Sequence, residues 1–230
     1  MSGSHCVHRR RLVACLGMTV AVFGASSAAA ADISDYFKMY YSQQVVGGTY
    51  KGPLDFLRDT AAAHANAEQV LKKGAGVALA VVLDAGNGYL RIDGNTGTDQ
   101  ILTMAVYRKA DGSQLLVVGS SNCADACIFS VEFFGVFPDR LQSVALDTVV
   151  PALESAQFIR PGVATPKPLA GRVPSINYVP AQVGTTLTLK PWYGYETEET
   201  MDKATRGAIR DVVLSWDREQ GRFVKARDSP

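Results

Sequence analysis

The stretch ILTMAVYRKADGSQLLVVG, residues 101–119, decides the fold class of this chain. Its two apolar runs, residues 101–108 and 114–119, flank the turn sequence Lys109-Ala110-Asp111-Gly112-Ser113. Aspartate and glycine between two runs rich in Val, Leu and Ile are typical of a β-hairpin. The stretch therefore predicts two antiparallel strands joined by a short turn.

Three more pairs of apolar runs are separated by short polar turns. In the last of them Val212, Leu214 and Trp216 alternate with other residues, so one face of that strand is expected to be buried and the other wet. The spacing between pairs is irregular, which indicates that hairpins of similar form recur without a true sequence repeat. The pairs are residues 77–83 with 89–93, 128–136 with 141–146, and 209–217 with 222–226, and residues 186–190 predict one further strand.

Two helices are expected before the strands. Ser34-Asp35 provides a cap and an acid ahead of four aromatic residues at helical spacing, and Gly47-Gly48 ends this first helix. A second helix is predicted from Pro53 to about Lys73, because proline suits a first turn and Lys72-Lys73 complements the C-terminal dipole. The fold class is therefore α+β, with two N-terminal helices packed on a mainly antiparallel sheet built from β-hairpins.

A proline-rich segment interrupts this pattern at about residues 155–185. It holds five of the chain's ten prolines, so we expect an extended surface arm or linker there. The piece that follows is too small for a core of its own. Residues 32–230 are thus predicted to form a single α+β domain, and a division into two domains at the arm is the alternative.

Residues 1–31 have the order of a secretory signal peptide. A basic cluster, Arg9-Arg10-Arg11, precedes the apolar residues 12–23, and a run of small residues then offers A-x-A cleavage sites. The prediction is export to the periplasm or the medium, with twin-arginine export as an alternative to the general route.

The charge balance argues against nucleic-acid binding. The chain has 23 Lys and Arg against 22 Asp and Glu, and residues 1–31 hold three of the arginines and no acid. The remainder carries a formal charge of −2, which does not favour nucleic acid or an anionic membrane, because binding either of them needs a clustered basic surface. No apolar run after residue 31 has the length of a membrane span.

Cys123 and Cys127 are the cysteines that remain after residue 31. They lie where one predicted strand must turn into the next, and an exported protein meets an oxidising compartment. We predict a disulfide that closes this turn. A metal-handling C-x-x-x-C pair is the alternative, although such a site usually recruits histidine and only His64 follows the signal segment.

Two weaker metal patterns are present. His64 and Glu68 would share one face of the second predicted helix, as two ligands of a zinc site do. Asp93, Asn95 and Asp99 alternate like the oxygen ligands of a calcium loop, but the pattern departs from the EF-hand order. An ordinary hydrogen bond and an ordinary loop are the preferred interpretations, and no cofactor is predicted.

The segment PWYGYE, residues 191–196, is the candidate binding surface. Trp192, Tyr193, Tyr195 and Glu196 combine aromatic rings with a carboxylate, a combination that anchors partner proteins or stacks on sugars. The structural alternative is that the rings seal the end of the sheet.

The chain lacks a G-x-S-x-G or S-x-x-K motif. Our functional prediction is an exported, non-enzymatic binding protein of the bacterial cell envelope that recognises a protein or an envelope glycan. The alternatives are a carboxylate-dependent envelope hydrolase and a metal-handling protein.

Overall fold

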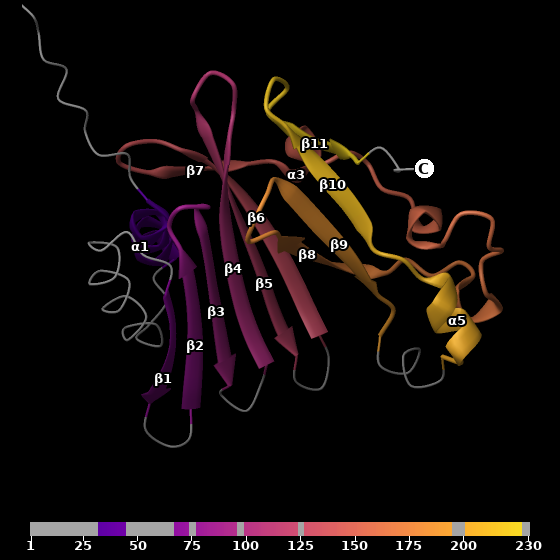
Figure 1. The fold of residues 1–230 in the computed structure, drawn as a ribbon. Helices are drawn as coiled ribbons and strands as arrows, with labels where there is room; N and C mark the ends of the chain where they lie inside the picture. The colour runs from indigo at the N-terminus through magenta and orange to yellow at the C-terminus, as the bar shows by residue number, and fades with distance from the viewer. Residues whose placement is uncertain are drawn as a thin grey trace, which may run out of the picture. The chain divides into compact units, whose positions relative to one another are not determined.

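Two antiparallel sheets and a few short helices make up the fold (Figure 1). The computed structural model describes residues 32–44, 67–73, 77–95, 99–123, 127–194 and 201–226. These residues belong to a unit that runs from Ala31 to Pro230. Within the described ranges, no helix has the length and apolar composition needed to cross a bilayer.

The first sheet is a seven-stranded meander in which each strand pairs with the next along the chain. All of its pairings are antiparallel. Its strands are β1 (Ala67–Lys73), β2 (Val77–Asp84), β3 (Tyr89–Asn95), β4 (Asp99–Arg108), β5 (Gln114–Cys123), β6 (Cys127–Val136) and β7 (Leu141–Val144).

The second sheet has four strands in the order β11-β10-β9-β8, again antiparallel. They are β8 (Ser175–Pro180), β9 (Thr186–Trp192), β10 (Val212–Asp217) and β11 (Arg222–Lys225). The connections carry the short helices α3 (Leu146–Val149), η1 (Ser155–Phe158), η2 (Lys167–Leu169) and α5 (Lys203–Ala208).

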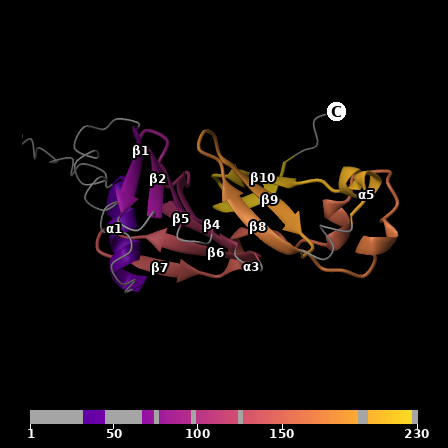
Figure 2. The same ribbon diagram turned by 90° about the horizontal axis from the view of Figure 1, so that it is seen from below.

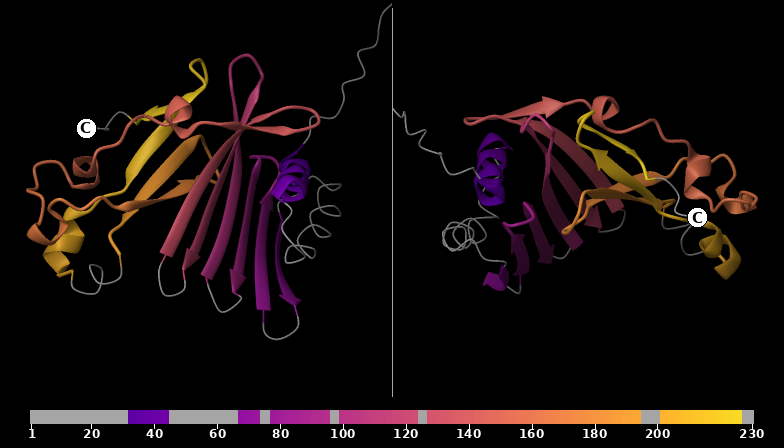
Figure 3. Two further views of the ribbon diagram at one scale, coloured as in Figure 1. Left: turned by 180° about the vertical axis from the view of Figure 1, so that it is seen from behind. Right: turned by 45° about the horizontal axis from the view of Figure 1, so that its top comes forward.

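The N-terminal helix α1 spans Ile33–Gln44 and lies against the first sheet, away from the second sheet (Figures 2 and 3). Its cap is Asp32, whose carboxylate accepts the backbone N–H groups of Ser34 and Asp35 at 2.9 and 3.2 Å. The sequence pointed to Ser34-Asp35 for this role. Ile33, Tyr36 and Phe37 are buried against the sheet, and Met39, Tyr40 and Tyr41 pack beside them with partial burial.

The second predicted N-terminal helix, from Pro53 to about Lys73, was wrong over residues 67–73. Residues 67–73, its expected C-terminal end, form strand β1, which pairs with β2 over its whole length from Ala67↔Leu83 to Lys73↔Val77. Residues 53–66 lie outside the described residues. The segment AEQVLKK has good helix formers, but helix propensity is a weak preference that pairing to a sheet edge overrides.

The proline-rich segment contains a strand that its sequence did not suggest. Residues 175–180 form β8, with Pro174 just before it and Pro180 as its last residue. Proline is compatible with an edge strand because its missing N–H removes no bond from the sheet interior. The rest of residues 155–185 holds η1, η2 and irregular connections.

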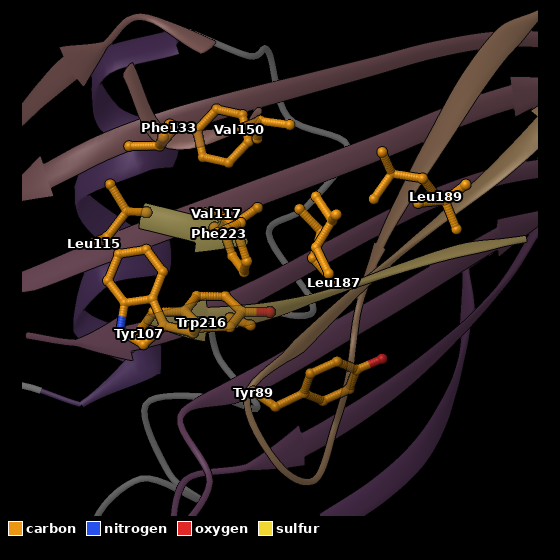
Figure 4. Packing of buried hydrophobic residues seen from close by; sticks show 14 of the residues in the cluster. Tyr89, Tyr107, Leu115, Val117, Phe133, Val150, Leu187, Leu189, Trp216 and Phe223 are labelled. Atoms are coloured by element: carbon orange, nitrogen blue, oxygen red, sulfur yellow. The ribbon is translucent and has the colours of Figure 1, made fainter. Parts of the chain in front are cut away.

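Strand β5 is buried on both faces, between helix α1 and the second sheet. Leu116 and Val118 face the cluster around α1, whereas Leu115 and Val117 face the second sheet. Because successive side chains of a strand point to opposite faces, the run LLVV is buried on both sides. Figure 4 shows the cluster between the sheets, where Tyr107, Trp216 and other side chains from both layers meet.

Two hairpin turns are joined by hydrogen bonds, which fixes one sheet on the other. The Trp216 indole N–H donates to the Arg108 carbonyl oxygen at 2.9 Å. The Ala110 backbone N–H donates to the Arg218 carbonyl oxygen at 3.0 Å. In addition, the Tyr107 hydroxyl donates to the Thr186 carbonyl oxygen at 2.9 Å. Buried polar groups of both sheets therefore satisfy one another.

Asp84 is a buried carboxylate, only 3% exposed, and its hydrogen bonds also link the two sheets. Its Oδ1 accepts the Asn87 backbone N–H at 3.1 Å, and its Oδ2 accepts the Asn87 side-chain amide at 2.8 Å. The Gln182 amide, from the turn between β8 and β9, reaches the same Oδ2 at 3.3 Å. Burial alone would raise the pKa of Asp84, but these hydrogen bonds outweigh it and hold the pKa below its ordinary value.

We expect the fold to lose stability in acid as the Asp84 carboxylate becomes protonated. A carboxyl whose pKa is lower in the folded state stabilises that state above its unfolded pKa of about 3.9. This contribution is lost as the pH falls through the folded pKa. Thermal melts between pH 2.5 and 7 should show Asp84→Asn less stable than wild type at pH 7, with the two curves converging in acid. Asp147→Asn, which changes an exposed carboxylate on α3, is the control. A constant gap between Asp84→Asn and wild type at every pH would contradict the assignment.

Candidate functional site

The residues of the predicted aromatic surface, 192–196, do not share one environment in the structure. Trp192 ends β9 and is half-buried, with its ring edge-on to Phe129 of β6 at a centroid distance of 5.9 Å. Tyr193 is only 8% exposed and packs with Ile159, Leu169 and Met201. That burial gives Tyr193 a packing role and leaves it little surface for a partner. Tyr195 and Glu196 lie outside the described residues.

Cys123 and Cys127 lie at disulfide distance, with 2.21 Å between their sulfur atoms. They are directly opposite each other at the end of the β5–β6 ladder, with Cα atoms 4.1 Å apart. The two cysteines are thus placed where the predicted disulfide requires them. The bond closes a short loop, for which the chain-entropy treatment gives a stabilisation of about 2 kcal/mol.

The metal patterns are not assembled in the described residues. Glu68 belongs to strand β1, so the helical spacing that paired it with His64 does not hold there, and His64 lies outside the described residues. Asp93 and Asn95 end β3 and Asp99 begins β4, while the Asp93 carboxylate binds the Arg91 guanidinium at 2.9 Å. Across the described ranges, no group of three or more His, Cys, Asp and Glu side chains could hold a metal ion.

An apolar pocket lies beside α3 and over β8. Its volume is about 580 Å³, within the range of small-molecule sites. Tyr178 and Ile176 of β8 are half-buried and pack against the cluster between the sheets. Its lining consists of Leu146, Asp147, Val150, Pro151, Ala152, Leu153, Ile176 and Tyr178.

Backbone hydrogen bonds hold the α3 side of this pocket. The Val150 N–H donates to the Leu146 carbonyl oxygen at 2.8 Å, and the Thr148 hydroxyl donates to the Ala145 carbonyl oxygen at 2.6 Å. Val150 is 3% exposed and belongs to the cluster between the sheets, whereas Leu146 is 43% exposed at the rim. The pocket is thus an open apolar surface, and hydrogen bonds hold the backbone on its α3 side in place.

The pocket offers few groups for acid–base chemistry. Its titratable groups are Asp147, which is exposed, and Tyr178. Burial raises the pKa of Tyr178 above its ordinary value, so its hydroxyl stays neutral and serves as a hydrogen-bond donor or acceptor. A single exposed carboxylate beside a neutral phenol does not form the paired acid and base that hydrolysis of a glycoside requires.

No sequence pattern pointed to this pocket. Its residues come from two stretches, 146–153 and 176–178, which meet only because β8 packs over the first sheet. A prediction would have required placing β8, which the prolines around it concealed.

No protein-family model matches the chain, and no curated protein matches it. Among solved structures the chain is similar to a domain of an uncharacterized protein from Porphyromonas gingivalis W83. The TM-score is 0.53 at 14% sequence identity, and the match covers 75% of this chain and 88% of that one. The likeness is one of fold. It supports the two-sheet architecture and carries no activity to this chain.

Proposed function

We propose that this chain is an exported, non-enzymatic binding protein, and that the pocket over Tyr178 receives an apolar side chain of a protein partner. The open apolar pocket of about 580 Å³ carries the proposal. Interfaces place their strongest contacts where an anchor side chain fills a desolvated pocket. Export is supported by the order of residues 1–31 and by a cysteine pair at disulfide distance, which suits an oxidising compartment.

A protein partner suits this pocket better than a glycan. Val150, Pro151 and Leu153 are apolar, whereas a sugar needs several hydrogen-bonding groups for its hydroxyls. The exposed carboxylate of Asp147 at the pocket would favour a cationic residue next to the apolar anchor, because opposite charges at an interface rim steer encounter.

Leu146→Asp tests the pocket, because it places a charge at the rim without touching the core. A photo-reactive amino acid at Ala152 should cross-link one discrete partner in intact envelopes, and Leu146→Asp should reduce this product at least about tenfold. The melting temperature should stay close to that of wild type, since an exposed substitution usually changes stability by about 0.5 kcal/mol or less.

Val213→Asp is the matched control, since Val213 is 41% exposed against 43% for Leu146 and lies on β10 instead of at the pocket. It should leave the cross-linked product unchanged. Equal capture by Leu146→Asp and wild type would contradict the proposal, as would turnover of an envelope substrate by the wild-type protein.

A further inference from the structure

A second, larger cleft has the opposite character from the apolar pocket. Its volume is about 900 Å³, and it shares no lining residue with the pocket over Tyr178. Three arginines and one aspartate give the lining a net formal charge of +2, in a chain whose residues after position 31 carry −2. The lining residues are Arg160, Pro161, Pro191, Arg206, Ile209, Arg210 and Asp211.

Two of the arginines are fixed by the backbone around them. Ile159 and Ile209 form an antiparallel bridge, flanked by hydrogen bonds from the Arg160 N–H to the Ala208 carbonyl oxygen at 2.8 Å and from the Arg210 N–H to the Phe158 carbonyl oxygen at 2.9 Å. Both isoleucines belong to one apolar cluster. The bridge therefore sets two cationic residues on neighbouring segments of one cleft.

The guanidinium of Arg210 is also oriented. Its Nε–H donates to the Gln157 carbonyl oxygen at 2.8 Å, and its four other N–H groups can serve a ligand. Within the described ranges, no carboxylate forms an ion pair with Arg160 or Arg210. Arg206, in the last turn of α5, donates from its Nε–H to the Met201 carbonyl oxygen at 3.2 Å.

We propose that this cleft is a binding site for a phosphate group. Guanidinium groups match phosphate oxygens in pairs of charge-assisted hydrogen bonds. A planar carboxylate is satisfied by one guanidinium, whereas a tetrahedral phosphate accepts donors from several directions, as arginines on separate segments provide. The open cleft and its apolar wall of Pro161, Pro191 and Ile209 leave room for the group that carries the phosphate.

Calorimetric titration with inorganic pyrophosphate tests the site. Wild type should bind it, Arg160→Gln should weaken binding at least about tenfold, and Arg160→Gln combined with Arg210→Gln should abolish it. Arg160 is exposed, so its replacement should leave the fold intact. Arg218→Gln removes the same charge from the exposed β10–β11 turn and should bind as wild type does.

Vesicles distinguish the source of the phosphate. Binding to phosphatidylglycerol vesicles but not to phosphatidylcholine vesicles, competed by pyrophosphate and lost in Arg160→Gln, would identify an anionic lipid headgroup. Binding to pyrophosphate alone would identify a soluble phosphate. Both results support the site.

Two outcomes would overturn it. One is the absence of pyrophosphate binding by wild type. The other is an equal loss of binding in the Arg160 and Arg218 variants, which would mean that pyrophosphate responds to net charge and not to this cleft. Leu146→Asp should bind pyrophosphate normally, so this site and the apolar pocket can fail independently.

Discussion

Phe223→Ala should destabilise the protein by about 4 kcal/mol, because the side chain joins the two sheets from a fully buried position. Its ring lies edge-on to Tyr107 of β4 at 4.8 Å and to Trp216 of β10 at 5.1 Å between centroids. Each such pair adds roughly 0.5–1.5 kcal/mol to the burial of the ring. The change removes a large volume from the centre of the cluster shown in Figure 4.

Chemical denaturation and thermal melts would measure this effect. A loss of this size lowers the melting temperature by roughly 8–16 °C in a domain of this length. Val224→Ala, at the next position of β11 and half-buried, is the control and should cost about 1 kcal/mol or less. A loss under 1 kcal/mol for Phe223→Ala would mean that the sheets do not pack as described.

The shape of the transition is informative as well. Tyr107 and Trp216 place the two sheets in one aromatic cluster, so unfolding should remain a single cooperative step. Two separate steps in wild type would favour the alternative drawn from the sequence, a division into two domains at the proline-rich arm.

Features with local causes were predictable from the sequence. The turn at Lys109–Ser113 closes with the Lys109 N–H on the Ser113 carbonyl oxygen at 2.8 Å, and Gly112 has a positive φ of 85°. Both properties follow from residues inside the turn itself. The pairing of Cys123 with Cys127 was predictable for the same reason, because only a short turn separates them.

Features with distant causes were not predictable. Residues 67–73 carry helix-forming side chains, and only the adjacent β2 makes them a strand. Strand β8 is concealed by its prolines, and its position depends on β9 on one side and on the first sheet beneath. The apolar pocket was not predictable for the same reason, since β8 supplies Ile176 and Tyr178 to its lining.

Gly119→Ala should destabilise the protein by about 3 kcal/mol, because β8 crosses β5 at this residue. A Cβ at position 119 would lie 2.5 Å from the Tyr178 carbonyl oxygen, closer than real contacts allow. The obstacle is backbone, so relief requires moving β8 or β5 and not merely a side chain. Only glycine permits this close approach.

Gly135→Ala in β6 is the matched control, since its nearest neighbour would be a Phe137 ring carbon at an ordinary 3.6 Å. Its stability should stay within about 0.5 kcal/mol of wild type, whereas Gly119→Ala should melt roughly 6–12 °C lower. Because Tyr178 also lines the apolar pocket, Gly119→Ala should weaken the Ala152 cross-link even at temperatures where the protein is folded. If Gly119→Ala matched Gly135→Ala in both measurements, β8 would not lie where the pocket requires it, and the proposed binding site would lose one of its walls.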